Sequence, residues 1–216
     1  SQIFIIWDKM FETFQPEMKE VEPVYGIIRP AGTWNPVIIN FKHIWQLIKD
    51  AWHTEQLIDK VRIWFMPTGW RPEDVAENYP IIAIGDPAKQ VKYETENSKW
   101  LIGWSWLQLT ITNVFMLHLF FVMASYEPVL VYLYASFIIA NVYSYTTVLD
   151  GKRSAWGGEL AKLGLGFYLL WLQNLSWFGF QGLIVPGFIS YLLLSAALTV
   201  VFLQREKQQK PTILPV

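Results

Sequence analysis

No Asp, Glu, Lys or Arg interrupts the stretch Trp100-LIGWSWLQLTITNVFMLHLFFVMAS-Tyr126, or the stretch Pro128-VLVYLYASFIIANVYSYTTV-Leu149 that follows it. A helix that crosses a bilayer needs about 20 predominantly apolar residues, so each stretch is long enough to cross. Only six residues between positions 101 and 203 carry a formal charge. The second half of the chain is therefore predicted to be an all-α membrane domain.

Two further apolar stretches complete a predicted four-helix transmembrane bundle. The predicted spans are at about 100–126, 128–149, 160–178 and 183–203. Glu127-Pro128 separates the first two spans, and Pro suits the first turn of a helix. Gly179-Phe-Gln-Gly182 separates the last two and is typical of a chain reversal. Short connections imply antiparallel neighbours, so the spans should form two hairpins.

The basic residues that flank the predicted spans all fall on one side. Lys152 and Arg153 lie in the link between the second and third spans, Lys99 precedes the first, and the tail 204–216 carries Arg205, Lys207 and Lys210. The two opposite links contain no Lys or Arg. Cytoplasmic loops carry an excess of these residues, so residues 1–99 and the tail 204–216 are both predicted to be cytoplasmic.

The segment 1–99 is polar but rich in Trp, with six of the 12 Trp of the chain. Trp favours the membrane–water interface, so this segment is expected to lie against the headgroups. An amphipathic helix is predicted within it, with Asn40 as its cap. Its apolar stripe is Phe41, Ile44, Trp45, Ile48, Ala51, Trp52 and Ile58. Such a stripe packs either on a protein core or on a bilayer surface, and the sequence leaves both readings open.

Few polar side chains fall within the predicted spans. Among them, the candidates for polar contacts within the membrane are Asn113, His118, Asn141, Gln173 and Asn174. Polar groups in hydrocarbon usually turn toward the bundle interior. The predicted topology places His118 in the same half of the bilayer as Gln173 and Asn174, within reach of hydrogen bonds. Interhelical hydrogen bonding, worth about 1 kcal/mol per bond, is favoured over a metal or quinone ligand, because one His makes no metal site by itself.

Composition argues against several classes of function. The net charge of −1 gives no basic field for nucleic acid, and the absence of Cys removes thiolate zinc sites and Cys nucleophiles. His43, His53 and His118 show no spacing typical of metal ligands. We therefore predict no catalytic residues, no metal and no cofactor within this chain.

One segment is similar to a known family. The sequence Ile5-IWDKMFET-Phe14 resembles the segment after the last histidine box of the fatty acid hydroxylase/sterol desaturase superfamily, W-D-R/K-x-F-G-T-F/Y. Glu12 stands where that motif usually has Gly. Within this superfamily, the sequence most resembles the alkylglycerol monooxygenase-like branch. It continues through Val24–Pro30, Trp34–Pro36, Asn40–Trp45, Asp59–Phe65 and Pro67–Pro72.

The resemblance implies a di-iron enzyme that uses dioxygen to hydroxylate or desaturate a sterol, fatty acid or ether lipid. The family binds two iron ions through about eight His in boxes upstream of this motif, and no such box is present in this chain. The leading hypothesis is the C-terminal membrane part of such a protein, with membrane lipids and the missing N-terminal catalytic part as partners. Its expected lipid-entrance residues are Trp34, His43, Trp45, Trp52 and Trp70. The alternative is a non-catalytic accessory subunit of a larger membrane complex.

Overall fold

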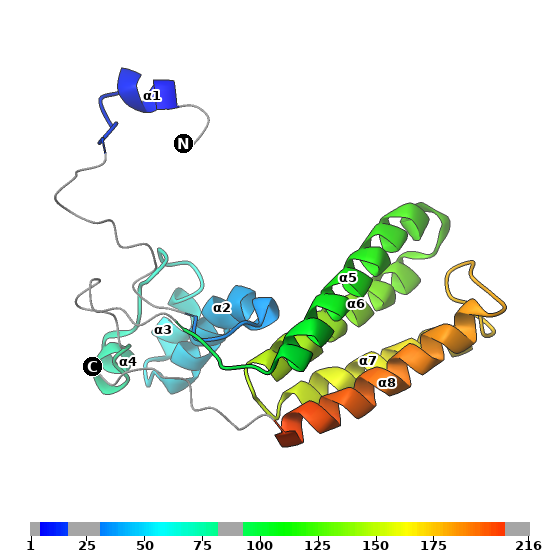
Figure 1. Ribbon diagram of the computed structural model, residues 1–216. Helices are drawn as coiled ribbons and strands as arrows, with labels where there is room; N and C mark the ends of the chain where they lie inside the picture. Colours follow the sequence, from blue (N-terminus) through cyan, green and yellow to red (C-terminus); the bar gives the residue numbers. More distant parts are fainter. Residues whose placement is uncertain (1–4, 17–30, 82–92, 206–216) are drawn as a thin grey trace. The chain divides into compact units, whose positions relative to one another are not determined.

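The computed structural model describes residues 5–16, 31–81 and 93–205, and these residues form helices and connections without a β-strand. The chain divides into two compact units. Within the described residues, the first unit contains only the short helix α1 (Ile5–Met10) and the residues that follow it to Pro16. The second unit contains α2 (Pro36–His53), α3 (Leu57–Arg62), α4 (Glu73–Asn78), α5 (Lys99–Val122), the 3-10 turn η2 (Met123–Ser125), α6 (Pro128–Leu149), α7 (Ala155–Leu172) and α8 (Ile184–Arg205) (Figure 1).

Helix α1 ends where the resemblance motif usually has Gly. Glu12 adopts a positive φ of 55°, a left-handed conformation that Gly adopts without strain. The backbone N–H groups of Thr13 and Phe14 then donate to the Asp8 carbonyl and close the helix. This conformation explains physically why Gly suits this position.

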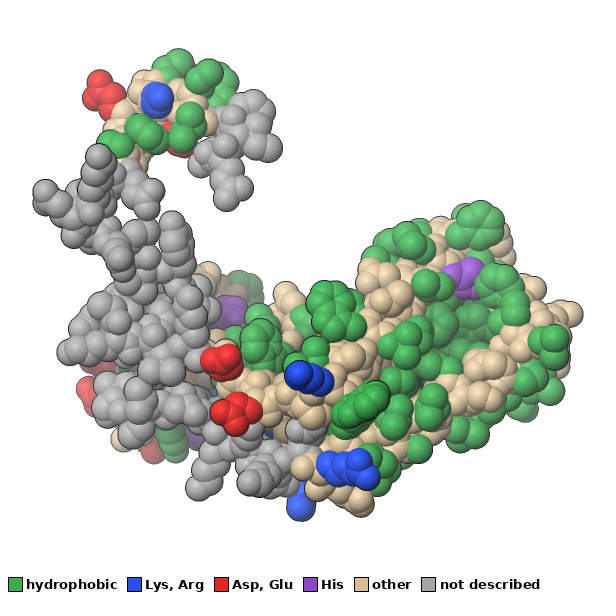
Figure 2. Space-filling view, in the orientation of Figure 1, with side chains coloured by type: hydrophobic (Ala, Val, Ile, Leu, Met, Phe, Trp, Pro, Cys, Tyr) green, Lys and Arg blue, Asp and Glu red, His purple; other side chains and the backbone are tan. Residues whose placement is uncertain are grey.

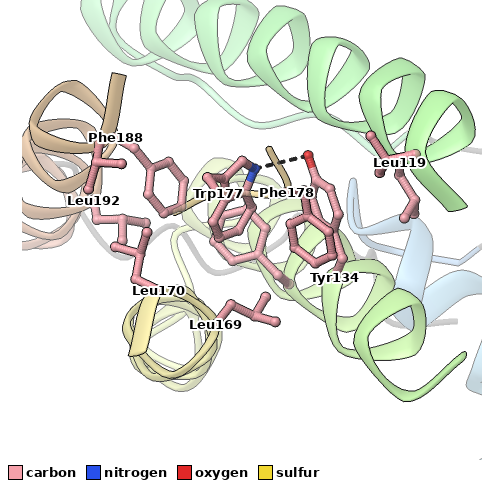
Figure 3. Packing of buried hydrophobic residues seen from close by; sticks show 11 residues of the cluster. Leu119, Tyr134, Leu169, Leu170, Trp177, Phe178, Phe188 and Leu192 are labelled. Atoms are coloured by element: carbon pink, nitrogen blue, oxygen red, sulfur yellow. Dashed lines mark hydrogen bonds between the residues drawn. The ribbon is translucent and has the colours of Figure 1, made fainter. Parts of the chain in front are cut away.

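Two buried hydrophobic clusters tie helices α5 to α8 together. One cluster contains Leu101, Val148, Ala155 and Phe202, which lie at the start of α5, the end of α6, the start of α7 and the end of α8. The other cluster contains residues from the opposite ends of the same helices, among them Leu119, Tyr134, Leu169 and Phe188 (Figure 3). The four helices therefore lie side by side and alternate in direction as two antiparallel hairpins (Figure 1).

Among the described residues, three helices are long and apolar enough to cross a membrane. They are α5 with its 3-10 extension (Lys99–Ser125), α6 and α8. Helix α7 has 18 residues, includes Glu159 and Lys162, and is not among the three. The three helices indicate an integral membrane protein, and the fourth span stays a prediction.

The third predicted span differs from the helix observed. The sequence places it at about 160–178, whereas α7 runs from Ala155 to Leu172. The helix starts earlier because Gly157 and Gly158, which suggest a loop in the sequence, are helical here. A Cβ at position 158 would come within 2.6 Å of Tyr143 Cδ1 and 2.9 Å of the Ser144 backbone nitrogen, so Gly permits α7 to approach α6 closely.

The predicted amphipathic helix also has different ends. Asn35, not Asn40, is the N-cap of α2, and its Oδ1 accepts from the backbone N–H groups of Val37 and Ile38. Pro36 then occupies the first helical position, which suits its missing N–H. The helix ends at His53, so Ile58 belongs to α3 and not to the stripe of α2.

Hydrophobic side chains cover most of the visible face of the bundle, and the Lys and Arg side chains visible there gather at one end (Figure 2). Several large side chains of α5 are strongly exposed, including Trp100, Trp106 and Phe121. Water-soluble monomers rarely expose apolar patches of this extent. The surface of the bundle is therefore chemically suited to hydrocarbon.

Candidate functional site

Helix α2 turns the side that contains Asp50 and Gln46 toward its own chain, and its apolar stripe is exposed. On the side toward the chain Asp50 is buried, and Arg71 binds its carboxylate through Nε (2.7 Å to Oδ2) and Nη2 (2.9 Å to Oδ1). Gln46 adds a further hydrogen bond of 2.8 Å to Asp50 Oδ1. Bidentate Arg–carboxylate pairs fix orientation as well as distance, so this pair holds α2 in one rotation about its axis.

That rotation leaves the apolar stripe of α2 uncovered by the described part of the chain. The exposed fractions are 58% for Phe41, 58% for Trp45 and 82% for Trp52. A helix with its hydrophobic stripe outward is the reverse of an ordinary surface helix and is typical of a helix that lies on a membrane or a partner.

The remaining candidate entrance residues lie around this helix in different environments. His43 is exposed on α2 but lies about 140° around the helix from Ile48, so this expected entrance residue does not share the apolar stripe. Trp34, just before α2, is half-exposed, and its Nε1 donates to Thr95 Oγ1 at 2.9 Å. Trp70 is partly buried, and the Arg62 guanidinium lies 5.3 Å from the centre of its ring. The described contacts do not bring the five residues into one pocket.

The C-terminal end of α2 is fixed by a second carboxylate. Asp74, in the first turn of α4, accepts the backbone N–H of Glu55 at 2.9 Å and the Thr54 hydroxyl at 3.0 Å. The hydrogen bond from Glu55 contributes most to holding the pKa of Asp74 below its ordinary value. Hydrogen bonds donated to a carboxylate favour its ionised form. The bonds from Thr54 and Glu55 therefore stabilise the turn between α2 and α3 while Asp74 is ionised.

Asp150, at the end of α6, connects the chain around α2 to the bundle. Its buried carboxylate accepts from the Thr33 hydroxyl, the Trp34 backbone N–H at 2.8 Å and the Tyr93 hydroxyl at 2.9 Å, and Lys152 lies 3.1 Å away. Burial, and then the bond to Asp150, raise the pKa of Tyr93. We refer to this carboxylate and its four partners as the Asp150 hub.

A second link lies beside the Asp150 hub. Asn35 Nδ2 donates to Thr147 Oγ1 at 2.6 Å and to the Tyr143 carbonyl at 3.2 Å, both in α6. The residue that caps α2 is therefore also hydrogen-bonded to a membrane helix. Together the two links attach the start of α2 to the end of the bundle that contains the C-terminus of α6.

The polar residues predicted within the spans have separate roles. Asn141 is buried, and its Nδ2 donates to Thr112 Oγ1 at 2.8 Å, which joins α6 to α5. Asn113 donates to the Leu109 carbonyl within its own helix and is exposed. Asn174 lies in the connection after α7 with a positive φ of 51°.

His118 and Gln173 have different hydrogen-bond partners. His118 Nδ1 lies 3.1 Å from the Tyr134 hydroxyl. Gln173 instead contacts its own connection: its Oε1 accepts from the backbone N–H of Phe178 at 3.1 Å. The expected hydrogen bond between His118 and Gln173 or Asn174 is therefore not among the hydrogen bonds of the described residues.

The most buried charges of the bundle do not stand out in the sequence. Glu159 and Lys162, both 0% exposed, lie three residues apart on α7, with Lys162 Nζ 2.7 Å from Glu159 Oε1. Ser144 of α6 and Thr199 of α8 contact Glu159 Oε2, and Ser195 of α8 contacts Lys162 Nζ. The spacing of three residues between Glu159 and Lys162 could have predicted an ion pair on one face of a helix. This prediction requires that both residues are helical, which becomes clear only once α7 is known to begin at Ala155.

Amide and hydroxyl groups extend this pair across the bundle. Gln108 of α5 donates to Ser195 at 3.0 Å, and Tyr191 of α8 lies 2.6 Å from Gln108 Oε1 and 3.0 Å from Asn141 Oδ1. All four helices α5 to α8 therefore contribute to one buried polar network. Such a network favours one helix arrangement over others, because any slip leaves buried polar groups unpaired.

The described residues contain no group of three or more His, Cys, Asp or Glu that could hold a metal ion. A pair of iron ions needs several such ligands, so the residues present here do not fit the metal centre that the resemblance implies. What this arrangement supports chemically is the positioning of α2 and its exposed aromatic side chains at one end of a membrane bundle.

Comparison with known proteins identifies homologues. The chain is 28% identical over 157 residues to alkylglycerol monooxygenase from Homo sapiens, a match that covers 71% of this chain and 34% of the relative. It is 23% identical over 151 residues to the enzyme of the same name from Xenopus tropicalis, covering 70% of this chain and 33% of the relative. A shorter match of 73 residues to the Danio rerio enzyme reaches 36% identity and covers 32% of this chain and 15% of the relative.

No family model and no solved structure matches the chain. The chain spans about a third of the length of the two relatives that it matches over most of its own length. These homologues fit the predicted resemblance to the fatty acid hydroxylase superfamily, alkylglycerol monooxygenase-like branch, which is thereby confirmed. They support a relationship to a family of lipid-oxidising membrane enzymes.

Proposed function

We propose that this chain is the C-terminal membrane part of a di-iron lipid hydroxylase-like protein, and that it presents lipid to a catalytic part supplied by other residues. The observation that carries the proposal is the outward apolar stripe of α2 on a chain homologous to alkylglycerol monooxygenases. In this proposal the two iron ions are bound outside this chain, and membrane lipids and the catalytic part are its partners.

Four transmembrane helices are part of the same proposal. The two buried clusters at opposite ends of the bundle each take residues from all four helices, so α7 reaches both ends of the bundle although it is the shortest of the four. At about 1.5 Å per residue, its 18 residues extend about 27 Å, close to the thickness of the hydrocarbon core. The buried pairing of Glu159 with Lys162 compensates the charges that make α7 less apolar.

The position of α2 follows from these four spans. Helix α2 is attached through the Asp150 hub to the end of the bundle where Lys152 and Arg153 lie. The positive-inside tendency makes that end cytoplasmic. Its exposed Trp45 and Trp52 would then enter the cytoplasmic headgroup layer, where a lipid chain reaches the catalytic part.

A chimera tests the proposal. The matched third of an alkylglycerol monooxygenase is replaced by this chain, and oxidation of an alkylglycerol in mixed micelles is measured. We expect activity, and we expect Trp45→Ala/Trp52→Ala in the chimera to raise the KM for lipid with a smaller effect on kcat. Replacing the exposed Trp106 of α5 by Ala serves as the control, because it also removes an exposed Trp but leaves the α2 stripe intact.

A chimera that is membrane-inserted and binds iron but does not oxidise lipid would contradict this function. That result would favour the alternative of a non-catalytic accessory subunit, for which copurification of this chain with a separate membrane protein is the expected sign.

A further inference from the structure

The connection between α7 and α8 places a large aromatic side chain inside the bundle. Trp177 is 2% exposed although it lies in a turn, and its indole fills a space between α5, α6 and α8 (Figure 3). The ring centres of Phe188, Tyr134 and Phe137 lie 4.2, 5.0 and 5.2 Å from that of Trp177, and Phe115 lies at 6.0 Å. We call the space lined by these four aromatic residues the aromatic socket.

One polar group lies in the aromatic socket, and its hydrogen bonds can be assigned. The indole Nε1–H of Trp177 can only donate, so the hydroxyl oxygen of Tyr134 accepts it at 3.3 Å. Tyr134 then donates its own proton to His118 Nδ1 at 3.1 Å. His118 is partly exposed, so the Tyr134 hydroxyl is only one side chain away from the surface of the bundle.

The turn that holds Trp177 in the aromatic socket has a strained backbone. Trp177 and Phe180 exchange backbone hydrogen bonds of 2.8 and 2.9 Å around Phe178 (φ 44°) and Gly179 (φ 95°). Positive φ at both central residues is the pattern of a type I′ turn, in which Asn, Asp or Gly is preferred and Phe is not. Leu175 also has a positive φ, of 58°, although its side chain is mostly exposed. Non-Gly residues in this region carry strain that only the surrounding packing maintains.

We propose that the aromatic socket is a binding site for a lipid with a long apolar chain and a hydroxyl group, and that this lipid and the Trp177 side chain exclude each other from it. The chain of the lipid replaces the indole against the aromatic rings, and its hydroxyl replaces the indole N–H as donor to Tyr134. The strained turn makes withdrawal of Trp177 less costly than removal of an ordinary core residue. The inference is independent of the proposed function, because the socket lies at the opposite end of the bundle from the Asp150 hub.

Photolabelling in lipid nanodiscs tests this inference with two probes of equal chain length. One is a primary alcohol with a diazirine in its chain, and the other is the corresponding alkane. Labelling of peptides that contain Phe137 and Phe188 is measured by mass spectrometry, relative to labelling at the lipid-exposed Phe121. Trp177→Ala, which empties the socket, shows how much labelling an open socket gives.

In the parent protein we expect the alcohol to label the socket several-fold more than the alkane, the ratio that one net hydrogen bond gives. Tyr134→Phe should bring this ratio close to one. Leu175→Asn relieves strain without changing the socket, because Asn tolerates positive φ, so it should reduce labelling by both probes and leave their ratio unchanged.

Three results would overturn the proposal. The first is labelling of the parent socket no greater than background while Trp177→Ala is labelled strongly. The second is an equal yield of alcohol and alkane in the parent. The third is a Trp177→Ala socket that takes neither probe. If Tyr134→Phe fails to fold, the comparison of the two probes in the parent and in Leu175→Asn remains decisive.

Discussion

At the scale of single residues, Glu159 and Lys162 compensate each other's charge inside the bundle. Replacing Lys162 by Met should lower the free energy of unfolding by about 3–5 kcal/mol, because it leaves the buried Glu159 carboxylate uncompensated. The double replacement Glu159→Gln/Lys162→Met should recover most of this loss. The free energies of unfolding of both variants can be measured by reversible unfolding in bicelles, with steric trapping as the readout.

Lys152→Met provides the control for that pair. Lys152 also lies beside a carboxylate, that of Asp150, but 38% of its side chain is exposed. Partly exposed ion pairs are worth about 1 kcal/mol or less, so this variant should change stability little. Equal losses in Lys162→Met and Lys152→Met would show that burial of the first pair does not matter.

Asp74 predicts a pH dependence at the end of α2. Its pKa in the folded protein lies below the ordinary value of 3.8, so the stability it contributes is present above that value. This stability is lost as pH falls through the lowered pKa. Hydrogen-exchange protection of the Glu55 amide, corrected for intrinsic rates, should therefore decrease below about pH 4 in the parent. In Asp74→Asn it should be low and nearly constant over the same range.

The structural role of a single residue can be predicted from the sequence only where its immediate neighbours in the chain determine that role. The Gly preference at position 12 is evident from the motif, and the left-handed φ of Glu12 explains it. The sequence predicts Asn40 as the cap of α2, whereas the cap is Asn35, which is also held by hydrogen bonds to Thr147 and Tyr143, more than 100 residues away. Long-range contacts of this kind leave no local pattern.

At the scale of elements, two glycines of α7 should respond in opposite ways to the same change. Gly158→Ala places a methyl group 2.6–3.0 Å from Tyr143 and the backbone of Ser144, so it should destabilise the α6–α7 contact by about 1–3 kcal/mol. Gly164→Ala meets nothing within 4 Å and should gain the helix propensity of Ala, about 0.5–1 kcal/mol. Thermal unfolding in detergent distinguishes them, and destabilisation of the same size in both would contradict the close approach.

The helices themselves could be predicted, because apolar length and periodicity are local properties. Their ends could not always be predicted, since the first turn of α7, which starts at Ala155, includes Gly158, whose place in the helix is explained by its close approach to α6. The sequence also left open whether the α2 stripe meets protein or lipid. The buried contact of Asp50 with Arg71 turns one side of α2 toward the described chain and leaves the stripe exposed, and contact of the stripe with lipid stays a prediction.

At the scale of the whole molecule, four spans predict the side on which each connection lies. The chain has no Cys, so a single Cys introduced at Ala76, Gln181 or Gln208 gives one reactive site each. An impermeant maleimide should label positions 76 and 208 from the same side and position 181 from the other, because α7 crosses. Labelling of 76 and 208 from opposite sides would mean three spans.

The most direct test of the lipid-presenting account is the depth of α2 in the bilayer. A fluorophore on Cys introduced at Ile48 reports the apolar stripe, and one at His43 reports a position away from it. We predict strong quenching of the label at 48 by headgroup- and upper-chain-borne quenchers, much weaker quenching at 43, and loss of this difference in Trp45→Ala/Trp52→Ala. Equal quenching at 48 and 43 in the parent, or none at either, would show that the stripe does not rest on lipid and would contradict the account.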